Sequence, residues 1–327
     1  MHNVTLSFKY SHHISQYIYG FLLLKKKNII NISKIDKDDN SASIQHILRA
    51  DIDGKKIVYD ANDGNHIERN FFSIPDYEWC DLYFKRSYSE NLAKNFPKCR
   101  PLGFNYEIKP VYGVVDNFFG NIRRLLGKEI VRHYDLETTP KVSNNPRVLF
   151  LTRLWEPEVI SEGSSYIEIE KYNEISKLNK LRVDALNMLS DNFKKISTIG
   201  INDIEYSRKI APNFILPKTQ THRRHFIYMM KNHEICITST GLHQSTGWRF
   251  GEFIASSRAI ISEPLEYIVP GNFNNYLPFK NIEELYQSVN RLVNDKELRY
   301  EMMEKNYNYY NNYLKPDRLI LNTLLSI

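Results

Sequence analysis

The sequence of 327 residues has few cysteines and no long apolar run. Cys80, Cys99 and Cys236 lie far apart and are odd in number, which excludes a disulfide framework and offers no zinc spacing. Unpaired cysteines are typical of a reducing cytoplasm. The longest apolar run near the N-terminus, Ile18–Leu24, is far shorter than the ~20 residues that span a bilayer. Residues 1–10 show no signal-peptide pattern, so we expect a cytoplasmic protein.

Excess charge is also small. Lys and Arg number 44 against 38 Asp and Glu, a net charge of +6, and no basic stripe stands out. This excludes an obvious nucleic-acid partner, but it suits a protein that handles phosphates or lies near anionic lipid. Lys25–Lys27 directly follow the apolar run. The simpler interpretation is a helix end that carries cations, and the sharper one is peripheral contact with an anionic membrane face.

The first half alternates short strands and helices. Asp53-Gly54 is a strong hairpin signal between two predicted strands, Ile44–Ile52 and Lys56–Asp60. Asp51 and Asp53 form an Asp-x-Asp pair of the kind that holds a metal in other sugar enzymes. The hairpin turn explains the pair better, and we expect no metal. The other elements expected here are a strand at Val4–Phe8, a helix at His12–Leu24 and a strand at Leu82–Phe84.

The second half predicts a doubly wound parallel sheet, in which ligands bind beyond the carboxyl ends of the strands. The predicted strands are Arg147–Thr152, Ile196–Ile201, Ile235–Thr238 and Ala259–Ser262, and helices are expected around Leu178–Leu189, Phe226–Met230, Phe250–Ser257 and Ile282–Val293. The polar segment Asp135–Pro146 is the expected linker. We therefore expect domains at residues 1–140 and 147–305, with a helical segment at 306–327.

The most informative segment is Ser239–Ser262, where a strand leads through a glycine-bearing loop into a helix. Gly241, Gly247 and Gly251 allow a close backbone approach to a ligand, and the amides at a helix start favour a phosphate. Glu252, in the first turn of that helix, can accept hydrogen bonds from a ribose diol. This outlines a nucleoside-diphosphate site, although a plain helix start with a favourable acidic residue would look similar.

This segment resembles the C-terminal domain of GT-B glycosyltransferases, especially the large retaining group, which carries two Glu residues separated by seven positions. Glu252–Ile261 follows the pattern that begins at the second Glu, with Ser257 for the usual Gly and Ala259 for the usual Pro. Gln244 stands eight positions earlier, where the family has its first Glu. The resemblance implies that Glu252 binds the donor ribose and that Gln244 lies near the donor sugar or phosphate.

A second match is Phe150–Leu154, which resembles the Gly-Arg-Leu pattern that ends the first strand of this domain. The resemblance implies that Arg153 holds the donor diphosphate. The family's nearby Lys is absent, so Lys180, Arg182 or Arg249 would supply the second cation. For Lys180 and Arg182 a solvated helix face is the simpler interpretation.

The final segment, with Tyr307–Tyr313 and Pro316, resembles the C-terminal helices that cross back in GT-B folds. The resemblance therefore implies an α/β fold of two Rossmann-like domains facing a cleft, with C-terminal helices on the N-terminal domain. Asn62-Asp63-Gly64 follows a predicted strand and would face the cleft, although a plain turn is the simpler interpretation. A histidine in the region of His12 and His13 contacts the sugar or acts as a base in some members; a surface pair is the simpler interpretation.

The resemblance implies a metal-independent glycosyltransferase without a cofactor. It would move a sugar from a nucleoside-diphosphate sugar to a glycan or lipid-linked acceptor, such as a bacterial surface polysaccharide, at the cytoplasmic face of the membrane. The expected catalytic residues are Arg153, Gln244 and Asp63. The expected donor-binding residues are Glu252, Gly241, His243, Gly247, Arg249 and Arg182. The alternatives are a sugar-nucleotide epimerase of the same fold and a catalytically silent nucleotide-binding partner protein.

Overall fold

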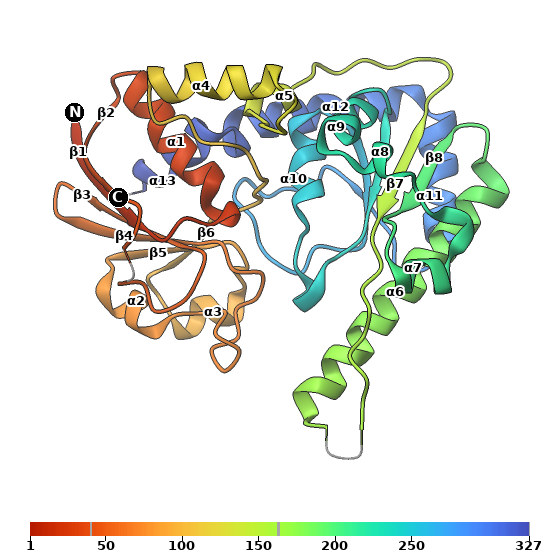
Figure 1. Ribbon diagram of the computed structural model, residues 1–327, viewed down its shortest axis with the longest axis horizontal. Coiled ribbons are helices and arrows are strands. Elements are labelled where there is room, and N and C mark those ends of the chain that lie inside the picture. Colours follow the sequence, from red (N-terminus) through yellow and green to blue (C-terminus); the bar gives the residue numbers. More distant parts are fainter. Residues whose placement is uncertain (40, 162–163, 327) are drawn as a thin grey trace.

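The computed structural model describes residues 1–39, 41–161 and 164–326, which form two α/β domains side by side (Figure 1). The N-terminal sheet has the order β2-β1-β3-β4-β5-β6. Its strands are β1 (His2–Phe8), β2 (Ile30–Asp36), β3 (Ile47–Ile52), β4 (Lys55–Asp60), β5 (Leu82–Lys85) and β6 (Cys99–Pro101). Neighbours run parallel except at β3, which is antiparallel to both β1 and β4. The predicted hairpin at Asp53-Gly54 is confirmed, and both residues have the positive φ that a type I′ turn requires.

The helices of this domain are α1 (Ser15–Lys26) with a preceding 3₁₀ turn (His12–Ile14), α2 (Ile74–Trp79), α3 (Glu90–Asn95), α4 (Val114–Leu125) and α5 (His133–Leu136). In this domain α1 lies on one side of the sheet and is buried along most of its length, whereas α2 and α3 lie on the other side (Figure 1). The predicted helix at His12–Leu24 is thus confirmed apart from its 3₁₀ start. Cys80, Cys99 and Cys236 are buried and free.

The C-terminal domain has a five-stranded parallel sheet in the order β11-β10-β9-β7-β8. Its strands are β7 (Val148–Thr152), β8 (Ser197–Ile201), β9 (Ile235–Thr238), β10 (Ala259–Ser262) and β11 (Leu277–Pro278). Its helices are α6 (Tyr166–Phe193), α7 (Glu205–Ile210), α8 (Lys218–Thr221), α9 (Arg223–Lys231), α10 (Trp248–Ala255), α11 (Ile282–Asn294) and α12 (Lys296–Tyr309). The four strands predicted for this half are all present, and residues 137–147 join the domains without helix or strand.

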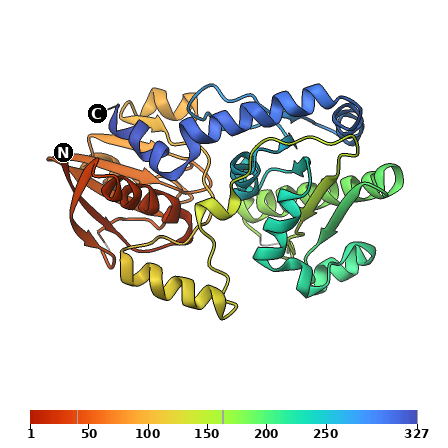
Figure 2. The same ribbon diagram turned by 90° about the horizontal axis from the view of Figure 1, so that it is seen from above.

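After α12 the chain passes through a π-helical turn (Tyr310–Leu314) into α13 (Pro316–Leu324), which packs on the N-terminal domain (Figure 2). The packing is close because α1 has Gly20 there: a Cβ at this position would lie 2.2 Å from the Pro316 carbonyl oxygen. Gln16 Nε2 donates to the Leu314 carbonyl oxygen at 2.7 Å. The expected architecture, two α/β domains facing a cleft with terminal helices crossing back, is therefore the one observed.

Candidate functional site

The carboxyl ends of the C-terminal strands face the N-terminal domain across a cleft of about 1180 Å³. The C-terminal wall is formed by the residues after β7 and β9 and by the start of α10. The N-terminal wall is formed by residues that follow β1 and β4 and by segments 107–109 and 129–131. This is the place where doubly wound sheets bind ligands.

Glu252 is the fifth residue of α10 and not, as expected, in its first turn, because the helix already begins at Trp248. It lines the cleft and is only 1% exposed. Its Oε1 accepts a hydrogen bond of 2.5 Å from the guanidinium of Arg223 at the start of α9. Its Oε2 is buried and has no hydrogen-bonding partner in the part of the chain that the structure describes. Burial alone would lower the pKa of Arg223, but Glu252 raises it overall. Since a buried acceptor without a partner is costly, Oε2 is a position at which a ligand hydroxyl would be stabilised.

Three arginines lie at the same end of the sheet. Arg249, in the first turn of α10, lies with its Cζ 5.2 Å from the Phe226 ring centroid and has no hydrogen-bonding partner among the described residues. Arg153 follows β7, and its guanidinium stacks 3.6 Å above the Trp155 ring. Burial, followed by the other arginines, lowers the pKa of Arg182 to about 10, and burial is also the main cause that lowers the pKa of Arg249 to about 10. Such mutually repelling cations favour an anion between them.

Arg182 of α6 differs from the other two because its donors are already used. Its side chain is buried and donates to the Ser239 hydroxyl and to the carbonyl oxygens of Arg153 and Thr240, at 2.9, 2.8 and 2.8 Å. It therefore ties the ends of β7 and β9 together, and the solvated helix face considered for it is wrong. Lys180 does lie on such a face, where it pairs with Asp184 at 2.6 Å.

The loop between β9 and α10 is fixed by hydrogen bonds to its backbone. The amide of Gly241 donates to the Ser245 carbonyl oxygen at 2.7 Å, and that of His243 donates to Glu174 Oε1 at 2.5 Å. His243 and Gln244 both have positive φ, 59° and 54°. The loop is thus held in place by contacts within the chain.

Some of the ligand-binding residues expected in this loop line the cleft, and others do not. Gly241, His243 and Gly247 line the cleft, and a Cβ at Gly247 would meet open space. Gln244 is exposed and does not line the cleft. Gly251 faces the other domain: a Cβ there would lie 2.9 Å from the Asn105 carbonyl oxygen, so its close approach is to protein backbone.

On the N-terminal wall, His13 stacks on His46 with 4.1 Å between ring centroids and meets Trp248 of the other domain edge-on at 4.9 Å. Burial, followed by the neighbouring His46, lowers the pKa of His13 to about 4, although Asp63 opposes this. His13 is therefore neutral at pH 7. The interpretation of a surface pair holds for the exposed His12, but it is wrong for the half-buried His13.

Asp63 lines the cleft and forms an ion pair with Arg86, which also donates to the Thr246 carbonyl oxygen of the opposite domain. Burial would raise the pKa of Asp63, but Arg86 and then His13 lower it overall. Asp63 is therefore an ionised carboxylate at the cleft, and Arg86 links it to the loop between β9 and α10.

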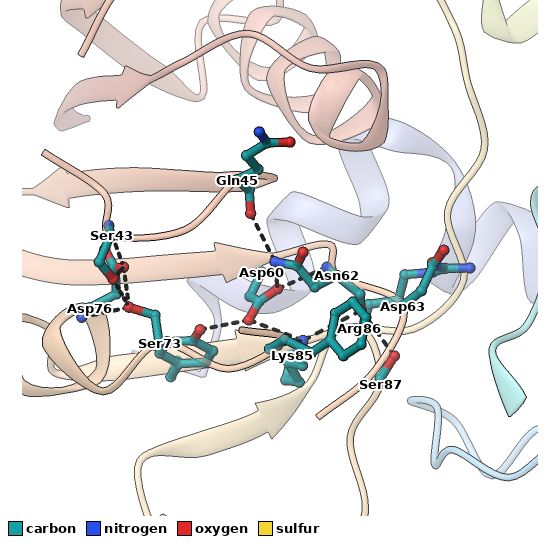
Figure 3. A network of polar contacts seen from close by, with 12 residues as sticks. Ser43, Gln45, Asp60, Asn62, Asp63, Ser73, Asp76, Lys85, Arg86 and Ser87 are labelled. Atoms are coloured by element: carbon teal, nitrogen blue, oxygen red, sulfur yellow. Dashed lines mark hydrogen bonds and ion pairs between the residues drawn. The ribbon is translucent and has the colours of Figure 1, made fainter. Parts of the chain in front are cut away.

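A buried network lies directly behind Asp63 (Figure 3). Lys85 and Asp60 form an ion pair of 3.0 Å, and both side chains are completely buried. Asp60 also accepts from Tyr83 at 2.6 Å and from the amide of Asn62 at 2.8 Å. Asn62-Asp63-Gly64 is therefore more than a plain turn, because the buried ion pair fixes the backbone that presents Asp63.

The remaining acidic candidates are used in a turn. Asp51 Oδ1 accepts from the Gly54 amide at 2.8 Å, and Asp53 Oδ1 accepts from the Asn3 amide at 2.9 Å. Across residues 1–39, 41–161 and 164–326, no three His, Cys, Asp or Glu side chains are grouped as a bound metal ion needs. The permanently charged cations that line the cleft are Arg86, Arg153, Arg182, Arg223, Arg249 and Lys109.

The sequence analysis missed Arg223, Arg86, His46 and Trp248. Arg223 starts a helix that was expected, and a basic residue at a helix start is unusual enough to have been a signal. The other three had no local signal, because their contacts join residues far apart in the chain.

No protein-family model matches the sequence, and no curated protein matches it. Solved structures do resemble it. WaaG, a glycosyltransferase involved in lipopolysaccharide biosynthesis, is 9% identical with a TM-score of 0.42, and the match covers 98% of this chain and 97% of that chain. The C-terminal domain of a glycosyl transferase group 1 family protein (LpcC) from Francisella tularensis is 10% identical with a TM-score of 0.37, covering 57% of this chain and 98% of that one. TarM is 12% identical with a TM-score of 0.42, covering 76% of this chain and 44% of that one. Two of the three carry the name of the class that the sequence resembles, but likenesses this weak carry no argument about activity.

Proposed function

We propose that the protein is a glycosyltransferase that transfers a sugar from a nucleoside-diphosphate sugar to a glycan or lipid-linked acceptor. One observation carries the proposal: Glu252, the fifth residue of α10, has a buried carboxylate oxygen without a hydrogen-bonding partner among the described residues, close to the guanidinium of Arg249, which also has none there. A carboxylate suits a ribose diol and a cation suits a diphosphate, and a nucleoside diphosphate carries both groups.

The reaction breaks the bond between the anomeric carbon and the diphosphate oxygen, and the diphosphate leaves with the electron pair. Arg249 and Arg153 would stabilise the negative charge that develops on it. The acceptor hydroxyl forms the new bond and loses its proton. Among the acceptors on the N-terminal wall, which also include His12, Glu107 and Glu129, we propose Asp63, which is ionised, or His13, which is neutral, as the group that takes that proton.

The acceptor that we propose, by analogy with the family that the sequence resembles, is a growing surface polysaccharide or a lipid-linked glycan. Acceptor and donor would enter from opposite walls, and closure of the two domains would exclude water from the reaction.

The test is a thermal-shift and calorimetry panel with UDP, GDP, CDP, ADP, TDP and CMP, with and without EDTA. A bound nucleotide at 100 times its Kd stabilises the folded state by about 2.7 kcal/mol. Glu252→Gln should weaken the binding of the preferred diphosphate about tenfold or more, because a neutral amide is a poorer acceptor for the diol. Glu301→Gln, at an exposed pair with Lys305, is the matched control.

Absence of any shift at millimolar nucleotide would overturn the proposal. One observation favours the second candidate, a catalytically silent nucleotide-binding partner: Gln244 replaces the family's Glu and lies outside the cleft. That candidate predicts nucleotide binding without release of sugar or its transfer from any donor. An epimerase would convert the donor sugar without any acceptor.

A further inference from the structure

Helix α4 is amphipathic, but its apolar side faces outwards. Its exposed apolar side chains are Val114, Val115, Phe118, Phe119, Ile122 and Leu125. Phe118 and Phe119 are 61% and 53% exposed, and Leu125 is 87% exposed. Large apolar side chains gathered on one exposed helix mark an interaction surface.

The orientation follows from how the helix is attached. Gly120 is the only buried residue of α4, and a Cβ there would lie 2.5 Å from the guanidinium of Arg132. At 3.6 residues per turn, the six apolar side chains fill an arc of about 140° whose centre lies opposite Gly120. The apolar face is thus turned directly away from the protein.

Positive charge gathers at the C-terminal end of this helix. Arg123 and Lys128 are exposed, and Arg224 of α9 donates to the carbonyl oxygens of Arg124 and Lys128 at 2.8 and 2.9 Å. The one acid in the helix, Asp116, accepts from the Tyr112 amide at the other end, at 3.0 Å. An apolar face beside a basic end matches an anionic lipid surface.

We propose that α4 docks this protein on the surface of a bilayer that contains anionic phospholipid. In the described part of the chain no helix has the length and apolar character to cross a membrane. The twelve residues of α4, about 18 Å of helix, would instead lie in the interface. Lys25–Lys27, the membrane contact considered from the sequence, is less suited to bind lipid than α4. These lysines stand at the end of α1, and Lys27 is paired with Asp317.

A second copy of the chain fits this face less well. A stripe about 18 Å long and about 10 Å wide is smaller than the roughly 800 Å² that each partner buries in a standard interface. Pairing two α4 helices in parallel would also bring their basic ends together. An anionic lipid surface takes up the apolar face and also attracts the basic end of the helix.

The place of α4 connects docking to the cleft. The chain that enters the helix lines the cleft at Glu107, Ile108 and Lys109, and the chain that leaves it lines the cleft at Glu129 and Val131. A membrane-bound α4 therefore holds the N-terminal wall close to the lipid surface. That docking serves a lipid-linked acceptor rests on the proposed function, whereas the docking itself does not.

The test is co-sedimentation of the full chain with vesicles of phosphatidylcholine alone and of phosphatidylcholine with a quarter phosphatidylglycerol. The wild type should bind the anionic vesicles. The double variant Phe118→Ser/Phe119→Ser should bind these vesicles at least about tenfold more weakly, because two phenyl rings are no longer transferred from water into lipid. Arg123→Glu/Lys128→Glu should also weaken binding, and added salt should lower the binding of the wild type.

The matched control is Tyr166→Ser/Ile167→Ser, an exposed apolar pair at the start of α6 in the other domain, which should bind like the wild type. Binding of the serine pair in α4 at wild-type strength overturns the proposal, as does a wild type that ignores anionic vesicles. So does a wild-type dimer in light scattering that becomes a monomer on Phe118→Ser/Phe119→Ser. Nucleotide binding in solution should be the same in every α4 variant, which separates this result from the fate of the proposed function.

Discussion

On the C-terminal wall of the cleft, Arg153 and Arg249 have no hydrogen-bonding or ionic partner for their guanidinium groups in the described residues, whereas on the N-terminal wall Asp63 is already paired with Arg86. The first wall is an unfinished electrostatic arrangement that an anion would complete. The pair of Asp63 and Arg86 on the second wall is complete without a ligand and is supported from behind by the buried pair of Asp60 and Lys85. The difference indicates that binding energy comes from one wall and fixed geometry from the other.

The largest loss of stability should come from the support of the N-terminal wall. Asp60→Asn leaves the Lys85 ammonium buried without its charge partner, and we expect about 3–5 kcal/mol less free energy of unfolding. Denaturant titration measures it. Lys34→Gln, at the exposed pair with Asp36, is the control and should leave the midpoint unchanged. A similar midpoint for Asp60→Asn and the wild type would show that the network does not support the wall.

The unpaired cations of the C-terminal wall predict a large effect on turnover with little on stability. Arg249→Met should lower kcat about 10²–10³-fold, because it removes a group aimed at the leaving charge. Its melting temperature should change little, since the substitution removes a costly buried charge and the repulsion by Arg223 and Arg153, while it loses the attraction of Glu252. Lys180→Met, a cation on the outer face of α6, is the control. Equal turnover of the two variants would contradict the role given to Arg249.

Arg182 and Arg153 sharpen the comparison within one wall. Arg182→Ala should cost about 2–3 kcal/mol of stability, because a buried guanidinium loses its bonds to two carbonyl oxygens and a hydroxyl. Arg153→Ala should instead lower turnover more than stability. Melting curves and kcat for the two variants separate the roles. The assignment fails if Arg153→Ala is the less stable protein.

The smallest effect concerns pH. The pKa of His13 is lowered to about 4 from an ordinary 6.5, so between these values the unfolded chain binds a proton that the folded protein does not. Stability should therefore fall as the pH drops from 6.5 towards 4. His13→Phe keeps a ring between His46 and Trp248 but cannot titrate, so its stability should fall less steeply across this window.

Melting temperatures at half-unit pH steps check this, with the exposed neighbour variant His12→Phe for comparison. His233, whose pKa is also lowered to about 4, mainly by burial, keeps part of the acid sensitivity in all of these proteins. A slope for His13→Phe as steep as that of the wild type would contradict the prediction.

Local patterns predicted the C-terminal half well. Ile235–Thr238 and Ala259–Ser262 are strands at their predicted bounds, since short β-branched runs between turn residues leave few alternatives. Long-range pairing was not predictable in this way. The partner of Glu252 is Arg223, and that of Asp63 is Arg86, both fixed only when helices and strands pack. The motif alone did not predict that Gln244 is exposed and outside the cleft, whereas its neighbours His243 and Ser245 line the cleft.

The return of α13 to α1 has a consequence for how the protein is made. Gln16 contacts Leu314, 298 residues further along the chain. During synthesis the first sheet and α1 emerge early, yet the helix that covers α1 emerges only after the whole second domain. The domain translated first therefore keeps a partly uncovered α1 until the second domain and α13 have also been made.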